Sequence, residues 1–200
     1  MRATVRCFLL EPTDQSMIEL RRMRIHPDAG ASEPCKGRLG YCNATVQTER
    51  GLSRLDPRSF GSGREPTAEE RADKRWPTAC AACGRPFAAE DHWQLNEHRL
   101  FAGAPSGLLV TVAEAPPGAI WRALWNEDSD AFVGQDGRSY YVKLPDGTEW
   151  CPDAPAANSN RPWTRTGIAP ELTCSPSIRT ARYHGYLVGG HLDPCSDSET

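Results

Sequence analysis

The chain has 200 residues and a net charge of −3, with 38% apolar and 8% aromatic residues. It therefore lacks the basic excess of proteins that bind nucleic acid through charge. The 17 glycines and 17 prolines favour short strands and turns over a helical bundle. Because apolar residues are few for this length, the predicted core is thin, and a bound metal ion is the expected support.

The N-terminal segment 1–11 contains an apolar run that is too short for a signal peptide, and no other stretch is long enough to span a bilayer. We therefore expect a protein that is made in a reducing cytoplasm and does not bind membranes. In that compartment, the eight cysteines are expected to be metal ligands or buried thiols rather than disulfides.

The first part of the chain has the alternating pattern of strands. Residues 4–10 and 17–25 read as two strands, with a turn at residues 12–15 between them. A third strand is expected at residues 41–47. These three segments predict a small sheet near the N-terminus.

A polar stretch follows at residues 49–75 and is expected to be a loop or insert. Within it, Thr67 and Glu70 have the spacing of a capping box, which predicts one short helix ending near Trp76. Residues 90–101 fit a short helix or a strand equally well, and both alternatives stay open.

The C-terminal half has a more regular strand pattern. Asp136-Gly137 and Asp146-Gly147 are hairpin turn pairs on either side of residues 139–144, which predicts a β-meander. No internal repeat is present at a fixed period. Strands are expected at residues 108–114, 120–125, 139–144, 172–174, 178–180 and 183–188.

The predicted fold class is mainly β with little helix. Short antiparallel strands are expected around a zinc-ribbon-like site of four cysteines, followed by the C-terminal meander. We expect an N-terminal region at 1–101, with 49–75 as its insert, and a C-terminal region at 102–200. The alternative is one continuous domain.

The clearest motif is Cys80-Ala81-Ala82-Cys83-Gly84, which has the form of a metal-binding knuckle. Two cysteines separated by two small residues can direct both thiolates at one ion, and the glycine permits a tight turn. A second pair of ligands is expected from an upstream segment, as in zinc ribbons. The predicted ligands of a structural Zn²⁺ are Cys35, Cys42, Cys80 and Cys83.

One alternative to this ligand set remains open, as does the role of the other four cysteines. His92 and His98 could replace Cys35 and Cys42, although the eight residues between Cys83 and His92 are fewer than the roughly twelve of a zinc finger. The remaining cysteines are single residues: Cys7 and Cys174 are expected in the core, and Cys151 and Cys195 in loops, where a second metal site or an oxidised pair is the alternative.

No catalytic motif is present. A catalytic site would have to be assembled from His184, Ser175 or Ser177, Asp136 or Asp146, and a cysteine, none of which lies in a known catalytic motif. The Asp-Gly pairs are explained as turns, and His184 as a structural residue of a strand. We therefore predict that the protein is not an enzyme and that four thiolates leave no open position on the metal.

Aromatic and basic residues suggest two binding surfaces. The tryptophans Trp121, Trp125, Trp150 and Trp163 either line a groove or fill a core that is short of aliphatic residues, and the core is favoured. The segments 21–24 and 74–76 are locally basic and could bind nucleic acid, or they could be a solvated strand face and a helix end.

Several segments outside residues 49–74 form a distinctive combination. They are Val5–Pro12, Arg75–Thr78, Glu114–Ala119 with Trp121, Gly134–Arg138, Leu144–Gly147 with Trp150, Asn158–Pro162, Ser175–Ile178 and Tyr183–Leu187. Together they resemble a family of proteins of tailed bacteriophages and prophages. The loop 156–162 departs from that family by lacking a cysteine, so any role of that cysteine is absent here.

The resemblance implies a phage-encoded protein that carries no assigned catalytic residue. The expected function is that of a non-catalytic, zinc-stabilised head or tail accessory subunit located in the virion. Its expected partners are other phage structural proteins or further copies of the chain, and nucleic acid is not expected. The alternative is a zinc-ribbon regulator that binds nucleic acid or a host factor during infection.

Overall fold

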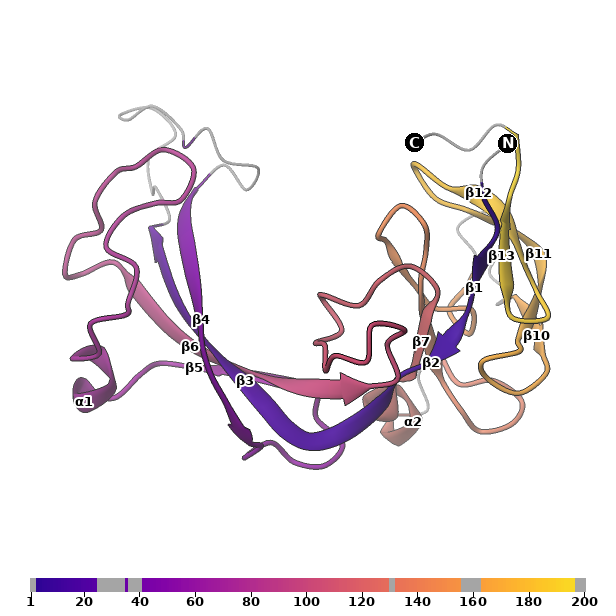
Figure 1. Cartoon of the computed structure of the whole chain (residues 1–200), viewed down its shortest axis with the longest axis horizontal. Helices are drawn as coiled ribbons and strands as arrows, with labels where there is room; N and C mark the ends of the chain where they lie inside the picture. The colour runs from indigo at the N-terminus through magenta and orange to yellow at the C-terminus, as the bar shows by residue number, and fades with distance from the viewer. Residues whose placement is uncertain (1–2, 25–34, 36–40, 130–131, 156–162, 197–200) are drawn as a thin grey trace. The chain divides into compact units, whose positions relative to one another are not determined.

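The computed structural model describes residues 3–24, 35, 41–129, 132–155 and 163–196 (Figure 1). Its contacts divide the chain into two units. Unit 1 comprises Met1–Thr13 and Phe101–Thr200, and unit 2 comprises Asp14–Leu100. The N-terminal segment thus belongs with the C-terminal half, a long-range association that sequence position alone does not reveal.

The predicted fold class is confirmed, because the described residues form mainly antiparallel strands and two short helices. Unit 2 is built from β3 (Glu11–Arg24, which begins in unit 1), β4 (Cys42–Leu52), β5 (Gly61–Arg64), α1 (Ala68–Arg71) and β6 (His92–Ala102, which ends in unit 1). Unit 1 contains β1 (Val5–Arg6), β2 (Phe8–Leu9), β7 (Ala119–Arg122), α2 (Leu124–Asp128), β8 (Tyr140–Lys143), β9 (Glu149–Trp150), β10 (Thr164–Thr166), β11 (Thr173–Arg179), β12 (His184–Val188) and β13 (His191–Pro194).

The sheet of unit 2 has the strand order β4-β3-β6-β5. The turn predicted at residues 12–15 is wrong, because β3 is continuous through Pro12. Pairing with β4 begins only at Gln15, opposite Leu52, so the missing N–H of Pro12 costs that ladder no hydrogen bond. The strand predicted at residues 41–47 is confirmed as part of β4.

The segment predicted as a loop at 49–75 is more ordered than expected, since it contains the end of β4 as well as β5 and α1. The capping box is confirmed: the Glu70 N–H donates to Thr67 Oγ1 at 3.2 Å, and the Thr67 N–H donates to the Glu70 carboxylate at 2.8 Å. The helix ends at Arg71, earlier than predicted. Residues 90–101 fall largely in the strand β6, which resolves the ambiguity in favour of a strand.

Unit 1 contains two sheets. The first has the order β2-β7-β8-β9, in which β7, β8 and β9 form the predicted antiparallel meander and β2 pairs parallel to β7. The predicted turns are confirmed, with Gly137 at φ +72° and Gly147 at φ +81°. The second sheet has the order β1-β13-β12-β11-β10.

Three predictions in the C-terminal half need correction. Residues 108–114 do not form a strand, since only Val110 makes a bridge, to Phe101, and the segment otherwise turns. The strand predicted at 120–125 ends at Arg122, where α2 follows. The strands predicted at 172–174 and 178–180 are parts of the single strand β11, whose register shifts between Cys174 and Ile178.

The two sheets of unit 1 meet in one apolar core. Ile120 and Val142 from the first sheet and Leu187 from the second are fully buried there. Cys7 and Cys174 belong to the same core, as predicted. In the part of the chain that the structure describes, no helix combines the length and the apolar character required to cross a membrane.

A buried ion-pair network also lies within unit 1. The Arg165 guanidinium donates to Asp153 at 2.9 Å and to Asp136 at 2.7 Å, and it lies 4.9 Å from the centre of the Tyr140 ring. The side chains of Arg165 and Asp153 are only 5% and 2% exposed. Since a buried charge is tolerated only when it is paired, these two groups depend on each other.

Candidate metal centre

The knuckle predicted from the sequence is a short hairpin. Ala79 and Pro86 form a β-bridge at its base, and the Cys80 N–H donates to the Arg85 carbonyl at 2.9 Å. The chain reverses at Gly84, whose N–H donates to the Cys80 carbonyl at 3.0 Å and whose φ is +72°. This left-handed conformation favours glycine, which explains why a glycine follows the second cysteine.

The other two cysteines come from an upstream segment. Cys42 is the first residue of β4, and Cys35 lies seven positions earlier in the sequence. The Ala81 N–H donates to the Asn43 carbonyl at 3.1 Å, and this bond attaches the knuckle to the beginning of β4. The knuckle hairpin and the segment that leads into β4 thus bring the two pairs of cysteines together.

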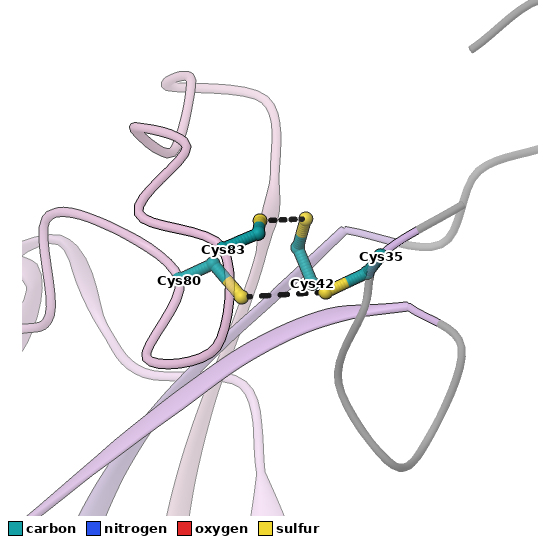
Figure 2. Close-up of side chains that lie close together, drawn as sticks. All are labelled: Cys35, Cys42, Cys80 and Cys83. Atoms are coloured by element: carbon teal, nitrogen blue, oxygen red, sulfur yellow. Dashed lines mark hydrogen bonds between the residues drawn. The ribbon is translucent and has the colours of Figure 1, made fainter. Parts of the chain in front are cut away.

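The four sulfur atoms all lie within 4.8 Å of one another. Figure 2 shows the two close pairs, in which Cys35 Sγ is 3.7 Å from Cys80 Sγ and Cys42 Sγ is 3.6 Å from Cys83 Sγ. In a tetrahedral site with metal–sulfur bonds of about 2.3 Å, neighbouring sulfurs lie about 3.8 Å apart. None of the eight cysteines, all of which the structure describes, forms a disulfide. The two close separations therefore have the size expected for a site that could hold one metal ion.

Burial and local hydrogen bonds act differently on the thiols of the cluster. Burial and the neighbouring thiols raise the pKa of Cys42 to about 12. At Cys80 burial opposes ionisation, but backbone N–H groups of the knuckle outweigh it and lower the pKa to about 6. Four thiolates at this distance repel one another strongly, so a cation is needed for all of them to be ionised.

An ion pair supports the cluster from the neighbouring strand. Arg24 lies opposite Cys42 in the β3–β4 ladder and binds both carboxylate oxygens of Asp91, at 2.8 and 2.5 Å. Asp91 also accepts the Ala88 N–H at 2.6 Å. The Arg24 guanidinium holds the pKa of the Asp91 carboxyl below its usual range. This pair fixes the chain segment that follows the knuckle to β3.

The basic segment 21–24 is engaged within the protein. Arg22 is buried, with its guanidinium carbon 3.5 Å from the centre of the Trp93 ring, and it donates to the Ala88 carbonyl at 2.5 Å. Arg21 donates to the Asn43 side chain at 3.0 Å. These contacts favour a structural role for the three arginines of the segment over a phosphate-binding surface.

The second basic segment, 74–76, is also engaged in contacts within the protein. Arg75 forms ion pairs with Asp73 at 2.7 Å and with Glu49 at 3.1 Å. Trp76 is buried and packs edge to face on Trp93, with 5.0 Å between the ring centres. Arg75 and Trp76 therefore take part in contacts of unit 2 itself.

The alternative histidine ligands lie elsewhere in unit 2. Both are on β6, and the cluster of metal-ligating groups found among the described residues contains neither His92 nor His98. His98 Nε2 is 3.8 Å from the Glu19 carboxylate. The contact with His98 lowers the pKa of Glu19. The geometry thus favours the four-cysteine set.

The residues considered for catalysis are partly scattered. His184 Nε2 is 3.4 Å from Ser177 Oγ, so this one pair is brought together. The carboxylates are engaged elsewhere: Asp146 accepts the Thr180 hydroxyl at 2.9 Å, and Asp136 pairs with Arg165. The two carboxylates considered for catalysis therefore take part in other contacts.

The four tryptophans mainly fill the interior of unit 1. Trp121 is 1% exposed, and Trp150 packs edge to face on Trp163 with 5.2 Å between ring centres. Trp125 differs, because it is 42% exposed and lies against Tyr141. The favoured core prediction thus holds best for Trp121 and Trp150.

Unit 2 contains a groove that the sequence pattern does not reveal. The groove has a volume of about 1130 Å³, and its lining includes the apolar side chains of Ile18, Leu20 and Leu95 together with charged residues of both signs. Glu97 also lines it and is only 8% exposed. The Glu97 carboxylate accepts the Ser16 hydroxyl at 2.6 Å. No sequence motif marks this groove, because its residues come from four strands, from α1 and from the segments between them.

Comparisons with known proteins give no relative: no family model, no curated protein and no solved structure matches the chain.

Proposed function

We propose that unit 2 binds one structural Zn²⁺ through Cys35, Cys42, Cys80 and Cys83. The observation that carries the proposal is the pair of sulfur separations, 3.7 and 3.6 Å, which match the edge of a tetrahedral four-thiolate site. Sulfur ligands in this arrangement suit zinc and also a single iron ion. The backbone N–H groups of the knuckle add hydrogen bonds to Cys80 Sγ and support its thiolate form.

A metal held by four thiolates keeps no position for water or substrate, so the ion stabilises the fold rather than activating a ligand. Its effect here is to join the beginning of β4 to the knuckle hairpin. Unit 2 has long connections between its strands, and such units commonly depend on a metal for folding.

Metal analysis of the purified protein tests this proposal. We expect one zinc per chain by native mass spectrometry, with elemental analysis separating zinc from iron. Cys80→Ser should lower the metal content well below one per chain. Cys195→Ser is the matched control, because Cys195 lies outside the cluster, and it should retain one zinc. A wild-type protein without metal after folding in the presence of zinc would refute the site.

We also propose that the protein is a non-catalytic accessory subunit that acts through contacts with other proteins, as the phage-like segments of the sequence suggest. The groove of unit 2 supports this proposal, since it offers apolar and charged groups over a surface large enough for a side chain or peptide. Quantitative mass spectrometry of purified phage particles tests it. Stoichiometric copies in the particle are expected, and confinement to the infected-cell lysate would contradict the proposal.

A further inference from the structure

The cysteines of the cluster differ in their access to solvent. Cys35, Cys42 and Cys80 are 5%, 1% and 3% exposed, whereas Cys83 is partly exposed. A dissolved oxidant therefore reaches the sulfur of Cys83 more easily than the other three. Metal-bound thiolates remain nucleophilic, so exposure decides which of them reacts.

The nearest partner of Cys83 lies on the other segment. Cys42 Sγ is 3.6 Å from Cys83 Sγ, and the second close pair, Cys35 with Cys80, also joins the two segments. In both pairs, one cysteine belongs to the knuckle and the other to the upstream segment (Figure 2). Disulfides formed within these pairs would connect the same parts of the chain that the metal connects.

We propose that Cys83 is a peroxide-sensitive modification site whose oxidation releases the metal and leaves a Cys42–Cys83 disulfide in its place. This inference rests on the proposed metal site. It assigns the cluster a second state, in which a covalent bond replaces the ion as the link between β4 and the knuckle.

The chemistry balances with hydrogen peroxide as the oxidant. The Cys83 thiolate attacks one peroxide oxygen, the O–O bond breaks, and a sulfenic acid and hydroxide form. The Cys42 thiolate then attacks Cys83 Sγ and expels a second hydroxide as the S–S bond forms. The two thiolates together lose two electrons, which reduce the peroxide. The ion is left with two of its four ligands and dissociates.

Stepwise oxidation of the zinc-loaded protein tests the proposal. Hydrogen peroxide is added in portions, zinc release is followed with a chromogenic chelator, and free thiols are alkylated before peptide mapping under non-reducing conditions. Alkylation keeps Cys80 and Cys83 distinguishable within one peptide. We expect one Cys42–Cys83 disulfide per zinc released, with Cys80 still alkylated in the first product. Treatment with dithiothreitol and zinc should restore the starting metal content.

Two serine variants test whether Cys83 is the thiolate that reacts first. Cys83→Ser also removes a ligand, so its zinc release is measured with and without peroxide. The peroxide-dependent part of the rate, per metal bound, should be about tenfold lower than in the wild type, because the exposed thiolate is lost. Cys195→Ser is the control, since Cys195 is also partly exposed but lies outside the cluster, and its release kinetics should match the wild type. The mapping of the wild type does not depend on either variant folding.

Three results would overturn the inference: a Cys80–Cys83 disulfide as the first product, sulfinic acid at Cys83 without any disulfide, or a peroxide-dependent zinc release from Cys83→Ser that is as fast as in the wild type. Failure of the proposed function is distinguishable from these, because the protein would then contain no metal before any peroxide is added. Mapping of that metal-free protein would still show which cysteines pair first.

Discussion

In unit 1, side chains from two sheets meet in one apolar core, in which Ile120, Val142 and Leu187 are fully buried. In unit 2, the buried side chains include a small apolar cluster of Leu20, Trp76 and Leu95 and, separately, the cysteine cluster. Burial of apolar area therefore stabilises unit 1 directly. In unit 2, the proposed metal would add a second contribution by linking β4 to the knuckle.

Metal removal should separate the two units most clearly. Structural zinc sites contribute about 10–16 kcal/mol of apparent binding free energy, which is comparable to the whole stability of a domain. We expect a strong chelator to abolish the protection of amides in β4 and in residues 79–87 while β11 and β12 keep theirs. Hydrogen–deuterium exchange with and without the chelator measures this, and added zinc should restore protection. Equal loss in both units would contradict the comparison.

A second experiment destabilises unit 1 and leaves unit 2 unchanged. Arg165→Leu would leave Asp153, whose side chain is 2% exposed, as an unpaired buried charge. We expect a loss of about 3–5 kcal/mol in the unfolding free energy of unit 1, with the zinc content unchanged. Urea unfolding followed by hydrogen exchange assigns the loss to one unit.

Arg64→Leu is the control for that variant, since Arg64 also pairs with a carboxylate, Glu70, but the two side chains are 47% and 32% exposed. We expect it to cost no more than about 1 kcal/mol. Similar losses for the two arginine variants would mean that the buried network contributes nothing beyond a surface ion pair.

Glu97 allows a pH test confined to unit 2. Burial alone would raise its pKa, but the Ser16 hydroxyl and the Arg54 N–H donate to the carboxylate and lower the pKa overall. A lowered native pKa adds stability that is present above the unfolded-state value of about 4.3 and is lost as the pH falls through the native value. Glu97→Gln should therefore cost about 1–3 kcal/mol at pH 7 and progressively less below about pH 4.

Urea unfolding of both proteins across this pH range measures the difference directly. Glu69→Gln is the control, because Glu69 is exposed on α1, and it should leave the stability of unit 2 unchanged at every pH. A Glu97→Gln penalty that stays constant down to pH 3 would show that folding does not lower the pKa of Glu97.

The local features were predictable from the sequence. The knuckle, the capping box at Thr67 and the turns at Gly137 and Gly147 each depend on a few neighbouring residues whose backbone preferences are strong. The grouping of the four cysteines was also predicted, since two ligand pairs on separate segments are needed to surround one ion.

The features that depend on distant residues could not be predicted. The sequence around Pro12 reads as a turn, yet it is the beginning of β3. The partners of this strand, β4 and β6, come from later segments of the chain, and the pairing with β4 starts only at Gln15. Residues 108–114 have a strand-like pattern but, beyond the single bridge at Val110, find no partner strand among the described residues. The Arg165–Asp153 pair joins a residue of β10 to a residue of a loop. No local sequence pattern predicts such a contact.

One glycine in each unit allows the smallest change to be compared between the two units. Gly84 in the knuckle and Gly137 in a hairpin of unit 1 both have φ of +72°, and a Cβ added at either would meet no atom within 4 Å. Replacement by alanine therefore costs only the strain of the left-handed backbone, about 1 kcal/mol at each position. Gly84→Ala should also weaken zinc binding by about fivefold, because the strain lies in the metal-bound state.

Competition with a chromogenic chelator measures the zinc affinity of both variants. Gly137→Ala should bind zinc as tightly as the wild type while lowering the stability of unit 1 by the same 1 kcal/mol or so. A weaker zinc affinity in Gly137→Ala would mean that the two units share their folding free energy. An unchanged affinity in Gly84→Ala would mean that the knuckle takes a different backbone conformation when the metal is bound. The left-handed conformation of Gly84 would then stabilise the hairpin without being required for metal binding.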